Sequence, residues 1–353
     1  MVVVGVDAHK RTHTCSAVDG IGRRLGVKTV PATTTGNATM LRWALSTFGP
    51  ELTWGIEDVR NVSRRLEEEL IRSGQRVVRV PTYLMARTRA SARTRGKSDA
   101  IDATAVARAV LREPDLPVAC HDSVSRELEL LTERRETLVD QRTATVNRVQ
   151  WRIHELDPIR SAELKPLIFA KHRAPVAAWL ADQPGLVAEL ARDELDDIAR
   201  LTQTINAVEK RIVQQVRAHA THLLGIPGCG ELTAAKIIAE TANVTRFKSE
   251  AAFARYIGVA PLPYSSGSTD GHMRFTRSGN RQLNAAVHRI AVTQIRMAGP
   301  GRQYYDKRRT KGNSSSAALR LLKRRITRAV FSRLKADEAD RRSQATADSP
   351  ERR

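Results

Sequence analysis

The sequence is poor in cysteine and in aromatic residues, and it has no long apolar run. Its three cysteines lie far apart and form no Cys-x-x-Cys pair, which excludes a disulfide scaffold and a cysteine zinc site and fits a reducing cytoplasm. Aromatic residues make up 4% of the chain, too few for a binder that relies on aromatic stacking platforms. No apolar stretch approaches the roughly 20 residues of a membrane-spanning helix, and the run at residues 2–6 is too short for a secretion signal.

Acids are scarce relative to bases. The chain has 59 Lys and Arg residues against 38 Asp and Glu, a net charge of +21 at pH 7, and Arg outnumbers Lys 47 to 12. A chain with this surplus repels itself and normally meets a polyanion, and the planar guanidinium binds phosphate through two hydrogen bonds. Nucleic acid is therefore the first expected partner, and an anionic membrane surface is the second.

Residues 1–118 alternate strand and helix patterns. Strands are expected at 2–6, 13–18, 25–30, 52–56 and 76–80, and helices at 38–48, 59–73 and 98–111. The Asp19-Gly20 turn favours a hairpin between the second and third strands. Three strands followed by alternating helices and strands predict a mixed five-stranded sheet flanked by helices, which is an α/β domain.

The rest of the chain is almost entirely helix-compatible. Residues 119–216 contain apolar heptad seams over 146–156 and 198–212, separated by a proline-containing break. The seams fit an antiparallel coiled-coil hairpin, a contact with a second subunit, or ordinary amphipathic core helices. Residues 217–336 form a second, mainly α domain, in which Gly228-Cys229-Gly230 precedes a helix expected at 232–241. Residues 337–353 are polar and are expected to be a disordered tail.

Four carboxylates stand out by their positions: Asp7 and Glu57 at strand ends, and Asp99 and Asp102 three apart on one helix. Acids at strand ends and on an adjacent helix can converge at one edge of a sheet. Such oxygen ligands suit hard divalent cations, and two Mg²⁺ ions (Mn²⁺ is an alternative) roughly 4 Å apart can promote phosphoryl transfer. Asp58 is the alternative to Glu57 if the strand ends one residue later. His9 is interpreted as a polar residue at a strand end.

Cations near these acids, and others in the second domain, are candidate phosphate contacts. A basic run directly precedes Asp99, and further cations lie around Ser278-Gly279-Asn280 and near the C-terminus. The candidates are Arg87, Arg89, Arg93, Arg95, Lys97, Arg277, Arg281, Lys323, Arg324 and Arg325.

Several of these motifs together resemble the insertion-sequence-110 family of transposases. The N-terminal resemblance lies in the D-E-D-D acids and their surroundings, Gly5-Val6-Asp7-Ala8-His9-Lys10, Glu57, and Lys97-Ser98-Asp99-Ala100-Ile101-Asp102-Ala103. The C-terminal resemblance lies in residues 224–230, Arg246-Phe247, residues 256–261, Ser265-Ser266-Gly267 and residues 277–284. It covers essentially residues 2–330; the residues after Glu57 depart from the family's small-residue pattern.

The resemblance implies an N-terminal RuvC-like domain with an RNase H fold, a coiled-coil connector and a C-terminal transposase domain. It further implies a DNA recombinase that uses the four acids with Mg²⁺, and a serine that forms a covalent link to DNA. That serine precedes Gly in the family, which corresponds to Ser266 here; Ser265 is adjacent. It also implies a structured guide RNA encoded in the element, and we expect a homo-oligomer, a dimer or a tetramer, in the cytoplasm.

Two other functions remain open from the residues alone. A RuvC-like DNA or junction endonuclease would use the same acids with water as the nucleophile. A non-enzymatic nucleic-acid-binding protein would keep the acids for structural reasons. No membrane role is expected, because the basic surplus lies beside the acids and in residues 302–353, which carry 16 Lys and Arg against 6 Asp and Glu.

Overall fold

The computed structural model divides the chain into two compact units. One unit comprises Met1–His121 with Thr245–Phe253, and the other Asp122–Val244 with Ala254–Arg353. None of the helices described is long and apolar enough to cross a membrane. The structure describes residues 1–57, 60–81, 84–85, 98–113, 116, 118–120, 122–263, 273–275 and 279–347.

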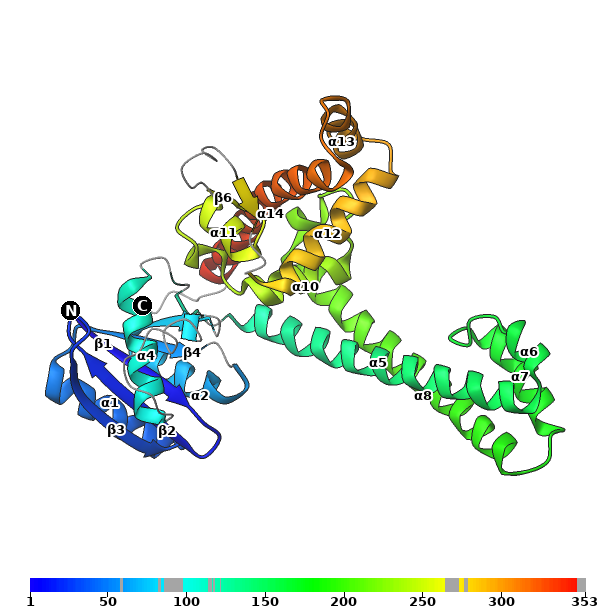
Figure 1. Ribbon diagram of the computed structural model, residues 1–353, viewed down its shortest axis with the longest axis horizontal. Coiled ribbons are helices and arrows are strands. Elements are labelled where there is room, and N and C mark those ends of the chain that lie inside the picture. The colour runs from blue at the N-terminus through cyan, green and yellow to red at the C-terminus, as the bar shows by residue number, and fades with distance from the viewer. Residues whose placement is uncertain are drawn as a thin grey trace. The chain divides into compact units, whose positions relative to one another are not determined.

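The first unit is built on a five-stranded mixed sheet (Figure 1). Its strand order is β3-β2-β1-β4-β5, with β2 antiparallel to both neighbours and β4 and β5 parallel to β1. This confirms the expected mixed five-stranded sheet of an α/β domain. The strands are β1 Val2–Ala8, β2 Thr12–Val18, β3 Arg24–Pro31, β4 Leu52–Glu57 and β5 Arg76–Val80.

Helices cover both faces of this sheet because its central strands are apolar on both sides. On one face, Val4 and Val6 of β1 pack with α1 (Thr34–Phe48) and α2 (Arg60–Arg72) in the main core. On the other, Val3 packs against α4 (Asp99–Arg112). Helix α1 starts four residues before its expected start, because the Thr33 side chain caps it by accepting a hydrogen bond from the Gly36 N–H.

Two glycines let α4 lie directly on the sheet. A Cβ at Gly5 would stand 2.2 Å from the Ala103 carbonyl oxygen, and one at Gly55 would stand 2.5 Å from a methyl carbon of Val110. A hydrogen bond of 2.7 Å between the hydroxyls of Ser16 on β2 and Thr104 on α4 adds a polar contact at this face. The helix axis is therefore held at a fixed, close distance from β1 and β4.

Two long helices, α5 (Ser123–Leu156) and α8 (Leu186–His219), dominate the second unit and lie side by side (Figure 1). Ion pairs join Arg135 to Glu209 at 2.6 Å and Arg152 to Glu194 at 2.9 Å. The residue numbers run in opposite directions, so the helices are antiparallel and pair within one chain. Helices α6 (Pro158–Ala162) and α7 (Ala170–Ala181) lie between them in sequence. Their coiled-coil packing and any role in oligomerisation stay predictions.

The remaining helices of this unit pack on one another and reach the hairpin mainly through α10. Helix α10 contacts α5, α8 and α12, which places the hairpin and the C-terminal helices in one compact unit. The division into domains at 119–216 and 217–336 stays a prediction. The elements that follow α8 in the chain are α9 Thr221–Leu224, α10 Glu231–Thr241, η1 Val244–Arg246, α11 Glu250–Ile257, β6 Pro261–Pro263, β7 Met273–Phe275, α12 Arg281–Arg296, α13 Pro300–Thr310 and α14 Ser315–Ala347. Of these, η1 and α11 include residues of the first unit.

The C-terminal segment differs from the expected disordered tail. Helix α14 continues to Ala347, and Asp337 on it is buried. The Asp337 carboxylate accepts hydrogen bonds from the backbone N–H groups of His222 (2.8 Å) and Leu223 (3.1 Å), at the start of α9. These bonds fix this part of α14, so the expectation was wrong for residues 337–347; residues 348–353 lie outside the described part.

Candidate active site

The acids at the two strand ends lie on the same side of the sheet. In the parallel pair of β1 and β4, Val6 is opposite Ile56. The residues that follow them, Asp7 and Glu57, therefore lie at neighbouring strand ends. Side chains alternate along a strand; Gly5 and Gly55 face α4, and two residues later Asp7 and Glu57 face the same way. Glu57 is the last residue of β4, whereas Asp58 lies outside the described residues.

The other two acids lie in the first turn of α4. The Ser98 hydroxyl caps this helix by accepting a hydrogen bond from the Ile101 N–H, which fixes where the helix begins. Residues three apart share a helix face, so Asp99 and Asp102 project together. The positive end of the helix dipole also favours negative charge in this turn. Asp102 is buried, whereas Asp99 is exposed.

The structure brings Asp7 and Asp99 close together and adds His9 between them. The His9 Nε2 atom is 3.0 Å from Asp7 Oδ2 and 3.6 Å from Asp99 Oδ1. One ligand atom from each of Asp7, His9 and Asp99 lies within 4.8 Å of the others. Interpreting His9 only as a polar strand-end residue therefore missed its position between two carboxylates. His9 directly follows the end of β1 and lies two residues after Asp7, and this spacing is the signal that could have placed it on the same side.

Burial and like charge both act on Asp7. Burial raises the pKa of the Asp7 carboxyl above its usual value, and the negative charges of Asp102 and Asp99 act in the same direction. The nearby His9 opposes this rise through its charge and its hydrogen bond. Asp99 and Asp102 thus both act on Asp7 through their charge, and the three carboxylates form one electrostatic cluster.

This cluster has the chemistry of a divalent-metal site. Hard cations such as Mg²⁺ prefer carboxylate oxygens and are bound with water in the remaining positions. Carboxylates that repel one another in a partly buried site are stabilised by a cation between them. The donor atoms of Asp7 and Asp99, with Asp102 and Glu57 on the same side of the sheet, fit such an ion.

The structure describes some of the other predicted site residues, whereas the rest lie outside the described part. Arg281 is exposed at the first position of α12, and Arg325 is exposed on α14. Lys323 is half-buried and donates a hydrogen bond of 2.5 Å to Asn284 Oδ1, and Arg324 is partly exposed. Those outside the described residues are Arg87, Arg89, Arg93, Arg95, Lys97, Ser265, Ser266 and Arg277.

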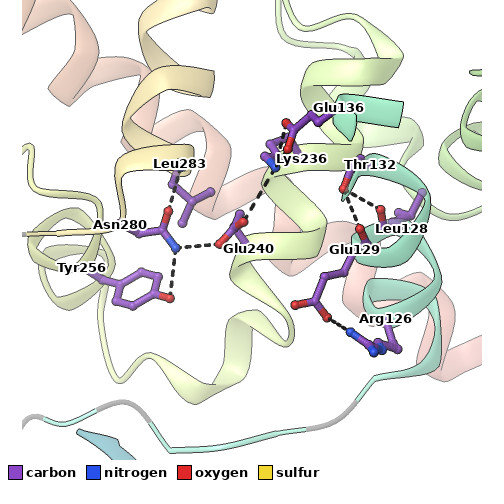
Figure 2. A network of polar contacts seen from close by, with 10 residues as sticks. All are labelled: Arg126, Leu128, Glu129, Thr132, Glu136, Lys236, Glu240, Tyr256, Asn280 and Leu283. Carbon is purple, nitrogen blue, oxygen red and sulfur yellow. Dashed lines mark hydrogen bonds and ion pairs between the residues drawn. The ribbon is translucent and has the colours of Figure 1, made fainter. Parts of the chain in front are cut away.

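Asn280 fixes the chain shortly after the segment that contains Ser266 (Figure 2). Its Oδ1 atom caps α12 by accepting a hydrogen bond from the Leu283 N–H at 2.9 Å. Its Nδ2 group donates to Glu240 Oε2 on α10 at 2.8 Å and to the Tyr256 hydroxyl on α11 at 3.3 Å. One side chain therefore joins three helices at this point.

The same network extends from α10 to the long hairpin (Figure 2). The buried Lys236 ammonium lies 2.9 Å from Glu136 on α5 and 4.0 Å from Glu240 on its own helix. A buried charge is costly unless it is paired, so these two carboxylates stabilise Lys236 where it is. Asn280 is thus attached through α10 to the base of the hairpin.

Two family models match the chain in succession. A model of DEDD transposases of the IS110 type, described as "Transposase", matches residues 4–156, the part that contains all four acids. A second, described as "Transposase IS116/IS110/IS902 family", matches residues 220–306, the part that contains Ser266. Together they match about two thirds of the chain.

Several curated proteins are similar over nearly the whole chain. A 42 kDa protein of insertion element IS900 from Mycobacterium paratuberculosis is 28% identical and covers 95% of this chain and 96% of its own length. A 44.8 kDa protein of insertion element IS116 from Streptomyces clavuligerus is 26% identical, with 94% of each chain covered. A transposase of insertion element IS1111A from Coxiella burnetii is 26% identical over 54% of this chain and 53% of its own.

Among solved structures, the T. thermophilus RuvC complex with a Holliday junction substrate is 15% identical. It covers 34% of this chain and 99% of its own, with a TM-score of 0.27, and supports no conclusion about this chain. The family assignment rests instead on the two family models, which match the acidic part and the serine-containing part in that order along the chain. The chain belongs to the IS110 family of insertion-sequence transposases.

Proposed function

We propose that this transposase cuts and rejoins the DNA of its own mobile element by metal-dependent phosphoryl transfer, with a serine as the nucleophile. The metal ligands would be Asp7, Glu57, Asp99 and Asp102, and the nucleophile would be Ser266. The observation that supports this most is the group formed by Asp7, His9 and Asp99, whose ligand atoms lie within 4.8 Å of one another, with Asp102 adding its charge to Asp7. Acids with only a structural role would have no reason to gather with like charge in one place.

Each group in the cluster has a definite task. Bound Mg²⁺, or Mn²⁺, would supply Lewis acidity to the phosphate and to the attacking oxygen. Asp7 and Asp102, which are buried, hold fixed oxygen atoms, and Asp99 and Glu57 complete the set from the helix and the neighbouring strand. His9 holds the Asp7 carboxylate through its hydrogen bond of 3.0 Å, so it orients this ligand.

The serine step exchanges one phosphodiester bond for another. The Ser266 hydroxyl loses its proton, its oxygen attacks the phosphorus, and the bond from phosphorus to a deoxyribose oxygen breaks. The departing deoxyribose oxygen takes a proton, and the phosphate remains on serine. A deoxyribose hydroxyl of the new partner strand then attacks this phosphate and releases the serine. Since Ser266 belongs to the second unit and the acids to the first, we infer a composite site, formed within one subunit or between two.

DNA is the substrate in this proposal, and a structured RNA encoded in the element is its guide. Base pairing would then read sequence, while the protein holds backbone and shape. The basic run of Arg87, Arg89, Arg93, Arg95 and Lys97 would contact phosphates near the acids, and Arg277 and Arg281 would do so near the serine. We place this activity in the cytoplasm, on nucleoid DNA, in a dimer or tetramer.

Two serine variants test the proposal. With Mg²⁺, end-labelled element-junction DNA and the element's RNA, the wild-type protein should form a covalent adduct visible on a denaturing gel. Ser266→Ala should reduce the adduct to background, because no other oxygen replaces a removed nucleophile. Ser265→Ala is the matched control, one residue away, and should retain the adduct.

The alternatives give different patterns in this assay. An endonuclease that uses water would cleave DNA with Ser266→Ala as it does with the wild type, and no adduct would form with either. A non-enzymatic binding protein would cleave DNA neither as the wild type nor as Ser266→Ala. Loss of the adduct in Ser265→Ala but not in Ser266→Ala would move the nucleophile by one residue and contradict the assignment. Omitting the RNA tests its role: full activity without it would exclude a guide.

A further inference from the structure

One segment of the second unit carries an unusual charge. Residues 300–333 contain eleven Lys and Arg residues and a single acid, Asp306, a net charge of +10. Helix α8, also 34 residues long, contains five basic and six acidic residues. Asp306 is itself paired with Arg302 at 2.7 Å. The surplus is therefore a property of this segment rather than of the helices in general, and it calls for an anionic partner.

Much of this charge is exposed on two packed helices. Helices α13 and α14 contact each other within one compact unit (Figure 1). Lys307 and Arg309 on α13, Lys311 just after it, and Arg325 and Arg333 on α14 are all exposed. The two packed helices together thus present several cations to solvent.

Tyr304 holds two of the guanidinium groups in place. The Arg308 guanidinium lies 5.1 Å and that of Arg325 lies 4.9 Å from the centre of the Tyr304 ring. Both contacts are cation–π interactions, which restrain the side chains without neutralising their charge. A restrained guanidinium loses less conformational freedom when it binds a phosphate. Arg325 is therefore prepared for an anion.

Arg325 also lines a cavity. The cavity has a volume of about 290 Å³ and lies between the turn at residues 225–227, the connection from α12 to α13, and one face of α14. Ile226, Met297 and Ile326 give it an apolar wall, and Arg325 and Arg333 both line it. Its volume is close to the roughly 300 Å³ at which sites for small organic ligands begin. An apolar wall beside two cations suits a ligand with a flat apolar part and an anionic part.

We propose that this cavity receives one unpaired nucleotide of a nucleic-acid strand whose phosphates lie along α13 and α14. The base would contact Ile226 and Ile326, its phosphate would bind Arg325 and Arg333, and flanking phosphates would meet the cations of α13. This inference rests on the proposed nucleic-acid function and adds where and in what form a strand is bound. A paired base cannot leave its stack without cost, so the site selects single-stranded segments, loops or ends.

Binding measurements on the full chain test the proposal. The probes are a fluorescent single-stranded DNA, an RNA of the same sequence and the blunt DNA duplex, each titrated at several salt concentrations. Ala329→Trp fills the cavity from α14 without changing its charge, and should weaken single-strand binding about tenfold, the order of magnitude of one lost base contact. Duplex binding should stay within about twofold, because phosphate contacts dominate there.

A charge variant and its matched control complete the test. Arg325→Gln/Arg333→Gln should lower the slope of log K against log salt by about 1.4 on single strands, at roughly 0.7 for each lost phosphate contact. Lys165→Gln/Lys171→Gln removes two exposed cations elsewhere in the second unit, and should leave the slope and the single-strand affinity unchanged. Comparing the DNA and RNA probes shows whether the cavity binds a DNA strand or an RNA strand.

Three results would overturn the proposal. One is wild-type single-strand affinity in Ala329→Trp, and another is an equal slope for the charge variant and its control. The third is normal single-strand binding by Ala298→Trp. This substitution fills the cavity from an exposed position in its wall, so it keeps the test valid if Ala329→Trp fails to fold. Adduct formation by the wild type, measured in the same preparation, distinguishes failure of this inference from failure of the proposed function.

Discussion

Replacing Asp7 with asparagine should lower metal-dependent DNA cleavage about a thousandfold, and Asp102→Asn should do the same. Each substitution keeps the size of the side chain and removes one negative charge from the cluster. Metal ions contribute several kcal/mol to stabilising the transition state of phosphoryl transfer, and a loss of about 4 kcal/mol corresponds to a factor of about a thousand in rate. The measurement is the single-turnover rate of strand cleavage with Mg²⁺.

Asp19→Asn is the matched control for these variants. It makes the same chemical change in the same unit, at the turn between β2 and β3, where Asp19 Oδ1 accepts hydrogen bonds from the N–H groups of Ile21 and Arg23. An asparagine oxygen can accept these bonds as well, so cleavage should remain within about twofold of the wild type, as for most surface substitutions. Cleavage at the wild-type rate by Asp7→Asn would show that this carboxylate is not a metal ligand.

Gly5→Ala should destabilise the first unit by about 3 kcal/mol or more, the upper range for overpacked cores. The added Cβ would lie 2.2 Å from the Ala103 oxygen and 2.3 Å from the Ala107 nitrogen. Both are backbone atoms, so α4 as a whole would have to move away from β1. Since α4 carries Asp99 and Asp102, cleavage should fall together with stability.

Thermal unfolding followed by circular dichroism measures this effect. The transition of the first unit should fall by roughly 10 °C. Gly20→Ala is the control, because a Cβ there would meet only the Met1 carbonyl oxygen at 4.0 Å, and its transition should stay near that of the wild type. Unchanged stability in Gly5→Ala would mean that α4 is not held against β1 at this distance.

The sheet and the strand ends that carry Asp7 and Glu57 could be predicted because their signals are local. Each strand is a short apolar run, and Asp7 and Glu57 mark the ends of two of them. The parallel pairing of β1 with β4 then brings the strand ends together without further information. The start of α4 could also be predicted, because a capping serine precedes Asp99 and an apolar helix follows.

Other features depend on partners far away in sequence. Whether His9 faces solvent or Asp99 is decided by where α4 packs, which no local pattern reveals. The end of α14 looks polar and disordered by composition, yet Asp337 caps a helix that begins more than a hundred residues earlier. The joining of Asn280 to Glu240 likewise depends on the packing of two helices. Because such polar contacts join residues far apart in sequence, local sequence patterns underestimate how much of the chain is ordered.

The proposed mechanism requires that Asp7 and Asp102 help to hold a divalent cation. Mn²⁺ bound to the protein loses its free-ion electron paramagnetic resonance signal, so a titration gives the number and affinity of bound ions. The wild type and Asp19→Asn should bind Mn²⁺ that Mg²⁺ displaces, and Asp7→Asn/Asp102→Asn should lose that binding. If the double variant bound Mn²⁺ with the number and affinity of the wild type, the acidic cluster would not be the metal site.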